Sequence, residues 1–165
     1  MIVALGLMVF IPMLVEAAVA GRHDRLLRAQ GAIEPIGDVY RLMQVVYPGA
    51  FLAMMLEAWL RHGRSNPALL AGIVVFVLSK GLKYWAIATL GNRWTFRVLV
   101  PPGSRRIVEG PYRVLRHPNY IAVIGELGGL AMMANARITG PVVTVLFLLL
   151  IRARTRVEER ALAAR

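Results

Sequence analysis

Residues 2–20 read IVALGLMVFIPMLVEAAVA and contain one ionisable side chain, Glu16, in 19 positions. An apolar run of this length is what an α-helix needs to cross a bilayer. Of the 165 residues, 58% are hydrophobic and 18% are charged, and the mean hydropathy is +0.59. A water-soluble domain of this size cannot bury so much apolar surface, and disordered segments are poor in apolar residues. The sequence therefore predicts an integral membrane protein.

Four further apolar segments follow the first one. They run from about 42 to 60, from 67 to 90, from about 119 to 134 and from 138 to 151. The last two are short for a bilayer, and Arg137 and Arg152 beside the fifth segment can extend to the interface. We therefore predict an all-α fold of about five transmembrane helices in a single membrane domain, with the N-terminal spans in residues 1–66.

The arginines are distributed unevenly around these segments. With the N-terminus placed outside, the cytoplasmic stretches are 21–41, 91–118 and 152–165, and they hold 15 arginines against three in the outer loops. Basic residues concentrate in the cytoplasmic loops of multi-pass proteins, so this predicts an odd number of spans and a cytoplasmic C-terminus. It also explains the net charge of +11 without nucleic-acid binding, because no basic run alternates with exposed aromatic residues.

Five ionisable side chains lie within or at the ends of the apolar segments, and each is a candidate site residue because charges in a bilayer are costly. We expect Glu16 and Glu57 to reach the interface in structural roles. Lys80 and Lys83 share a helix face, where they either extend to the inner interface or face a polar cavity. Glu126 lies two turns into the fourth segment, where pairing with Lys80 or Lys83 is one explanation.

Three local patterns carry expectations about packing. Gly125 and Gly129 form a G-x-x-x-G pair, which favours close approach of two helices. Residues 94–100 read WTFRVLV and are partly apolar, so we expect them to pack on the membrane surface. Residues 152–165 contain strong helix formers and no Gly or Pro, so we expect the fifth helix to continue into the cytoplasm.

Residues 110–120 read GPYRVLRHPNY and directly precede the fourth segment. Gly110–Pro111 predicts a turn, and Pro118 suits the first turn of a helix, where its missing N–H costs nothing. His117 is then expected at the helix start, where free backbone N–H groups favour an anion. On the residues alone, an ordinary interfacial helix start with tyrosines at headgroup depth is the favoured interpretation.

The GPY at 110–112 and the RHPNY at 116–120 resemble the signature of isoprenylcysteine carboxyl methyltransferase and its small bacterial relatives. Two further blocks are similar to the same relatives, WAIATLGNRW at 85–94 and RTRVEERAL at 154–162. The three blocks occur in the family's order, each on the expected side of the membrane. The resemblance implies that residues 67–165 form a methyltransferase-like catalytic part.

This resemblance implies an S-adenosylmethionine-dependent methyltransferase embedded in the membrane, without a metal site. The implied donor-binding residues are Arg105, Arg106, Ile107, Val108, Tyr112, His117, Pro118, Asn119, Tyr120 and Glu158. Arg154 and Glu158 form an R-x-x-x-E pair on one helix face. The resemblance implies that Arg154 is the catalytic residue that orients an anionic acceptor, and that Glu158 binds the polar end of the donor.

The acceptor is open at this stage. The acceptor is expected to be a prenylated or lipidic molecule. Its reacting group is either a carboxylate, as in isoprenylcysteine, or an enol or phenol oxygen. A polar donor from the cytoplasm and a lipid-tailed acceptor from the bilayer meet at the inner membrane face, and the high Arg and Ala content favours a bacterial inner membrane. Two other classes are kept: an NADPH-dependent sterol-type membrane reductase, which shares the R-H-P-x-Y ending, and a non-enzymatic small membrane protein.

Overall fold

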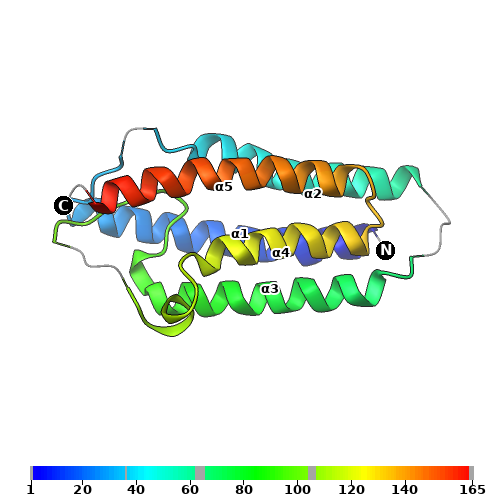
Figure 1. Cartoon of the computed structure of the whole chain (residues 1–165), viewed down its shortest axis with the longest axis horizontal. Helices are drawn as coiled ribbons and strands as arrows, with labels where there is room; N and C mark the ends of the chain where they lie inside the picture. The colour runs from blue at the N-terminus through cyan, green and yellow to red at the C-terminus, as the bar shows by residue number, and fades with distance from the viewer. Residues whose placement is uncertain (1, 36, 62–65, 104–106, 164–165) are drawn as a thin grey trace.

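The computed structural model describes residues 2–35, 37–61, 66–103 and 107–163, with side chains described as far as Arg160. Within these residues the fold is all-α. Its elements are α1 (Ile2–Ala29), α2 (Tyr40–Leu60), α3 (Leu69–Leu90), the short 3-10 helices η1 (Gly91–Arg93) and η2 (Gly110–Arg113), α4 (Pro118–Met133) and α5 (Thr139–Ala163). The five α-helices run along the long axis of the molecule, and the two termini lie at opposite ends (Figure 1).

Among the described residues, three helical stretches are long and apolar enough to cross a membrane: Ile2–Ala29, Tyr40–Leu60 and Leu69–Arg93. Large apolar side chains on these stretches are exposed, for example Leu14 at 70% and Leu78 at 68%, as a lipid-facing surface requires. The helices thus indicate an integral, multi-pass membrane protein. The predicted number of five spans is not confirmed, because α4 has only 16 residues and α5 becomes charged after Ile151.

Glycines bring α4 into close contact with α3, as the G-x-x-x-G pair predicted. A Cβ on Gly129 would lie 2.8 Å from the backbone N of Phe76, and one on Gly72 would lie 2.8 Å from the backbone O of Gly129. Gly125 faces the side chain of Ser79, with which a Cβ would collide. The two backbones therefore meet directly, and this packing fixes the position of α4.

Glu57, near the end of α2, connects that helix to the start of α5. Its carboxylate accepts hydrogen bonds from the backbone N of Ile138 at 3.2 Å and from the backbone N of Thr139 at 2.7 Å, and it pairs with Arg61 at 3.1 Å. A carboxylate at a helix N-terminus satisfies N–H groups that the helix leaves unpaired. This is a structural role, although only 8% of Glu57 is exposed.

The three arginine-rich stretches gather at one end of the molecule, near the C-terminus (Figure 1). There, Ile33 and Val100 form an isolated antiparallel bridge. The expectation that residues 94–100 lie on the membrane surface is wrong, because Trp94 and Val98 are only 3% and 6% exposed. The bridge holds this segment against the connection between α1 and α2, so that its apolar side chains turn inwards.

The close contact of α3 and α4 predicts a position-specific effect of one added methyl group. Gly129→Ala is expected to lower the free energy of unfolding by about 1–3 kcal/mol, because the α3 backbone would have to move. Thermal unfolding of the purified protein in detergent measures the effect. Gly128→Ala is the matched control, since nothing lies within 4 Å of its Cβ. Equal melting temperatures for the two variants would contradict this packing.

Candidate active site

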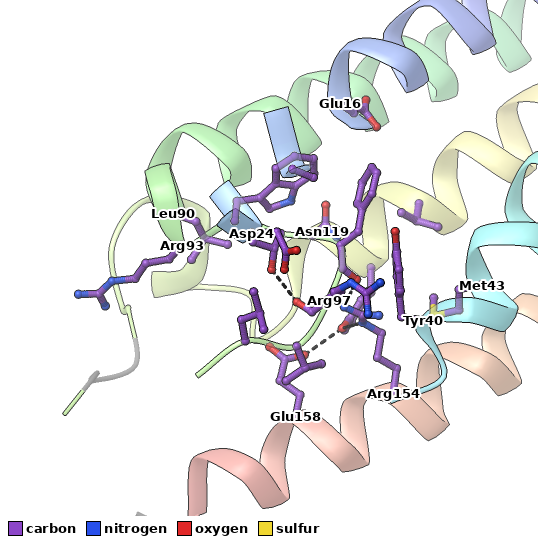
Figure 2. A pocket seen from close by; sticks show the side chains of 18 of the residues that line it. Glu16, Asp24, Tyr40, Met43, Leu90, Arg93, Arg97, Asn119, Arg154 and Glu158 are labelled. Atoms are coloured by element: carbon purple, nitrogen blue, oxygen red, sulfur yellow. Dashed lines mark hydrogen bonds between the residues drawn. The ribbon is translucent and has the colours of Figure 1, made fainter. Parts of the chain in front are cut away.

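A cavity of about 570 Å³ lies at the end of the bundle where the arginine-rich stretches meet. Its wall includes parts of α1, α2, residues 94–101, η2, the start of α4 and the end of α5. Glu158 and Arg154 project into it from α5, and Glu16 of α1 lies at its opposite end (Figure 2). The volume falls within the range of about 300–1,000 Å³ that small-molecule sites occupy.

The turn before α4 is held against the end of α3. Gly110 has a φ of +53°, which favours glycine, and a Cβ there would lie 3.2 Å from the indole nitrogen of Trp85 and collide with Thr89. The following residues form η2, which places Tyr112 in the cavity wall. Burial raises the pKa of the Tyr112 hydroxyl, and the carboxylate of Glu158 raises it further. This hydroxyl therefore stays protonated at neutral pH and is able to donate a hydrogen bond.

Two buried polar atoms at the start of α4 lack hydrogen-bond partners. The helix begins at Pro118 with His117 as its N-cap, as predicted. The rings of His117 and Tyr120 stack with their centroids 5.5 Å apart, and Nε2 of His117 lies 3.5 Å from Oε1 of Glu159. In the described part of the chain, neither this nitrogen nor Oδ1 of Asn119 has a hydrogen-bond partner. Buried polar atoms normally have one, so Oδ1 of Asn119 can serve a ligand, whereas Nε2 of His117 already faces the carboxylate of Glu159.

Tyr120 links the start of α4 to α5. Its hydroxyl donates to Oε2 of Glu158 at 2.9 Å and accepts a hydrogen bond from Nε of Arg154 at 2.9 Å. The i,i+4 spacing puts Arg154 and Glu158 on one face of α5, so that both reach Tyr120. The start of one helix and the exit of the next thus share one cavity.

Arg154 has two further partners that sequence reasoning did not single out. Its Nη1 lies 3.2 Å from Oδ1 of Asp38, in the connection between α1 and α2, and its Nη2 donates to the carbonyl of Phe96. Only 7% of the Arg154 side chain and 3% of the Asp38 side chain are exposed. No local pattern in a connecting loop signals a pairing with a residue 116 positions later.

Most of the residues predicted to bind the methyl donor or the acceptor molecule line the cavity. They are Ile107, Tyr112, His117, Asn119, Tyr120, Arg154 and Glu158. Pro118 is fully buried and begins the helix without lining the cavity, and Val108 is 65% exposed and lies outside the wall. Arg105 and Arg106 lie outside the described residues. What each residue binds stays a prediction.

Four charged side chains, three of them buried and Lys80 only 12% exposed, alternate at the end of the cavity that holds Glu16. We call Glu16, Lys80, Lys83 and Glu126 the ionic ring. Lys80 lies 2.8 Å from Glu16 and 3.0 Å from Glu126, and Lys83 lies 2.6 Å and 3.2 Å from the same two acids. Tyr47 of α2 donates to Glu126 at 2.6 Å. The predicted pairing of Glu126 is confirmed, whereas Glu16 pairs with both lysines instead of reaching the interface.

The ionic ring connects α1, α3 and α4, and through Tyr47 it also reaches α2. Its formal charge is zero, which avoids the cost of an unpaired charge in a low-dielectric interior. Lys83, Glu16 and Tyr47 are part of the cavity wall, and Lys80 joins them through the ring. Of the two alternatives for the lysines, the polar cavity is observed for Lys83, whereas Lys80, which lies outside the cavity wall, pairs with Glu16 and Glu126.

Residues 71–164 match the model of the isoprenylcysteine carboxyl methyltransferase (ICMT) family. The chain belongs to this family. YpbQ of Bacillus subtilis is 32% identical over 148 residues, which are 89% of this chain and 88% of YpbQ. A Haemophilus influenzae protein is 26% identical over 143 residues, 86% of this chain and 83% of that protein. Both relatives are described as uncharacterized, and no solved structure matches the chain.

Membership of the ICMT family confirms the resemblance read from the three sequence blocks. All three blocks, at 85–94, 110–120 and 154–162, fall inside the matched region. The ionic ring straddles its boundary, because Lys80, Lys83 and Glu126 lie inside the matched region and Glu16 lies before it. The N-terminal helices therefore contribute to a cavity that the family region builds only in part.

The ionic ring predicts that two substitutions compensate each other. Lys83→Met leaves two buried carboxylates with one cation and is expected to cost about 3–5 kcal/mol of stability. Adding Glu126→Gln restores neutrality, so the double variant is expected to melt at a higher temperature than Lys83→Met alone. Thermal unfolding in detergent compares the three proteins. A double variant less stable than the single one would show that these charges do not act as a unit.

Proposed function

We propose that this protein is a membrane-embedded, S-adenosylmethionine-dependent O-methyltransferase. The observation that carries the proposal is the convergence of motif residues from two distant segments on one cavity: Tyr112, His117, Asn119, Tyr120 and Glu158. Family membership supports the same activity. An interfacial helix start with no ligand would not need a buried polar atom without a hydrogen-bond partner, and among the described residues Oδ1 of Asn119 is such an atom.

The end of the cavity lined by Tyr112, Asn119 and Glu158, which we call the polar end, fits the methyl donor. The Tyr112 hydroxyl donates a hydrogen bond, Oδ1 of Asn119 accepts one, and the Glu158 carboxylate attracts an ammonium group. The aromatic ring of Tyr120 stabilises a cation placed over its face. When bound, S-adenosylmethionine supplies a methyl group on a sulfonium, which an oxygen nucleophile accepts by in-line displacement.

The proposed acceptor is a lipidic or prenylated molecule that presents a carboxylate, or an enol or phenol oxygen. Apolar side chains of α1 and α2, including Met13, Leu14 and Met43, line the cavity next to the membrane-facing helices and suit such a molecule. Tyr112, Asn119 and Glu158 would hold the donor, which would supply its methyl group to the lone pair of the acceptor oxygen while the electron pair of the carbon–sulfur bond returned to sulfur. An anionic oxygen needs no base, so the protein contributes alignment and exclusion of water.

We place the cavity at the cytoplasmic face of a bacterial inner membrane, with the N-terminus outside and all five helices crossing. The arginine-rich stretches gather at the cavity end of the molecule (Figure 1), as this orientation requires. The short α4 and the apolar part of α5 span the bilayer if they tilt little and if Arg137 and Arg152 extend to the interfaces.

Removing the charge of Glu158 tests the donor site. Glu158→Gln is expected to weaken the binding of S-adenosylhomocysteine by about tenfold or more, because a hydrogen bond to a charged group contributes about 1.5–3 kcal/mol. Isothermal titration calorimetry on the protein in detergent measures the affinity. Glu109→Gln, which changes an exposed acid outside the cavity wall, is the matched control. Wild-type affinity in Glu158→Gln would contradict the role of this residue.

The same titration separates the proposal from the other two function classes. A sterol-type reductase would bind NADPH, and a non-enzymatic membrane protein would bind neither NADPH nor S-adenosylhomocysteine. Wild-type protein that binds S-adenosylhomocysteine and not NADPH is the expected result. Either of the other outcomes would overturn the proposed function.

A further inference from the structure

Asp38 lies behind the cavity wall and is not part of it. Resting on the proposed function, we infer that Asp38 is a positioning residue of the donor site. It neutralises Arg154 and orients its guanidinium, so that Tyr120 and Glu158 are held where the donor binds. Asp38 lies outside residues 71–164, so the N-terminal half of the chain completes a site that the family region does not build alone.

The contacts of Asp38 join three separate segments. Oδ1 accepts hydrogen bonds from Nη1 of Arg154 at 3.2 Å and from the backbone N of Tyr40 at 3.1 Å, and Oδ2 accepts one from the backbone N of Val98 at 3.0 Å. With 3% of its side chain exposed, this carboxylate depends on these partners to offset the cost of burial. One side chain thus connects the start of α2, the segment 94–100 and α5.

The planar guanidinium of Arg154 transmits this constraint. Its N–H groups point in fixed directions, so holding two of its nitrogens determines where the third points. Asp38 takes Nη1, the carbonyl of Phe96 takes Nη2, and Nε then faces the hydroxyl of Tyr120. Because that hydroxyl accepts from Nε, its own proton is directed to Oε2 of Glu158.

The same contacts change the role of Arg154 from the one the family resemblance implies. All three of its nitrogens are engaged within the protein, and its charge is balanced by Asp38. Through Nε it acts on the donor site by way of Tyr120, and this action does not require Arg154 to take the anionic group of the acceptor. Glu158 accepts its hydrogen bond from a neutral hydroxyl and keeps its negative charge for the cationic group of the donor.

A double-mutant cycle on S-adenosylhomocysteine affinity tests this inference. The variants are Asp38→Asn, Tyr120→Phe and the combination, titrated by calorimetry in detergent. Asp38→Asn is expected to weaken binding about tenfold. If Asp38 acts through Tyr120, the affinity of the double variant stays within about twofold of the affinity of the weaker-binding single variant. Multiplied effects of the two substitutions would show independent action and overturn the inference.

Glu57→Gln is the matched control for loss of stability alone. It also removes a buried, hydrogen-bonded carboxylate, but Glu57 lies at the other end of the bundle and is absent from the cavity wall. It is expected to lower the melting temperature and leave the affinity unchanged within twofold. Equal loss of affinity in Glu57→Gln and Asp38→Asn would reduce the effect of Asp38 to general destabilisation and overturn its positioning role.

Arg154→Lys provides a second route if Asp38→Asn does not fold. Lysine keeps a cation beside Asp38 but lacks the planar group that reaches Tyr120 and Phe96. It is expected to lose affinity about tenfold and to be non-additive with Tyr120→Phe. Wild-type affinity in Arg154→Lys, or in a folded Asp38→Asn, overturns the inference while the proposed function stands. Absence of binding by the wild-type protein overturns both.

Discussion

A charge inside an apolar bundle needs a partner of opposite sign, and the ionic ring meets this need for four charges at once. Its geometry also sets the spacing of the helices. Where α4 meets α3, glycines let the backbones touch, but α1 is joined to α3 through the long side chains of Lys80 and Lys83. Because extended lysine side chains bridge α1 and α3, the two helices are separated by more than a direct backbone contact would allow, and space is left beside them. The cavity lies in this space, with Glu16 and Lys83 in its wall.

The polar end of the cavity is organised by a second set of contacts. Tyr120 receives a hydrogen bond from Arg154 and gives one to Glu158, so a single hydroxyl joins α4 to α5. The glycine contacts between α3 and α4 decide where Tyr120 stands, because they fix the helix that carries it. Packing inside the bundle and hydrogen bonding at its end therefore depend on each other, and a change in one is expected to be measured in the other.

Local signals in the sequence predicted the elements that local physics controls. Pro118 marked the start of α4, the G-x-x-x-G pair marked the contact with α3, and the unbroken run of helix formers predicted that α5 continues beyond its apolar part. The pairing of Glu126 with the lysines of α3 was a long-range contact that the cost of a buried charge predicted, but other features that depend on long-range contacts were not predicted. The inward turn of residues 94–100 depends on a bridge to Ile33, and the burial of Asp38 depends on an arginine on another helix. Neither partner is recognisable from spacing or composition.

The cavity divides between the two parts of the chain in a way that suits a reaction with two chemically different substrates. The motif residues of the region that matches the family lie at its polar end, where the proposed function places the water-soluble donor. Helices α1 and α2 precede that region and provide the apolar side chains next to the membrane-facing surface. On the proposed function, the family region fixes the donor and its reaction, and the N-terminal helices select the lipidic acceptor. The Asp38–Arg154 pair then joins the N-terminal part of the chain to the region that matches the family. This link gives a physical reason for the buried carboxylate of Asp38 in the connection between α1 and α2.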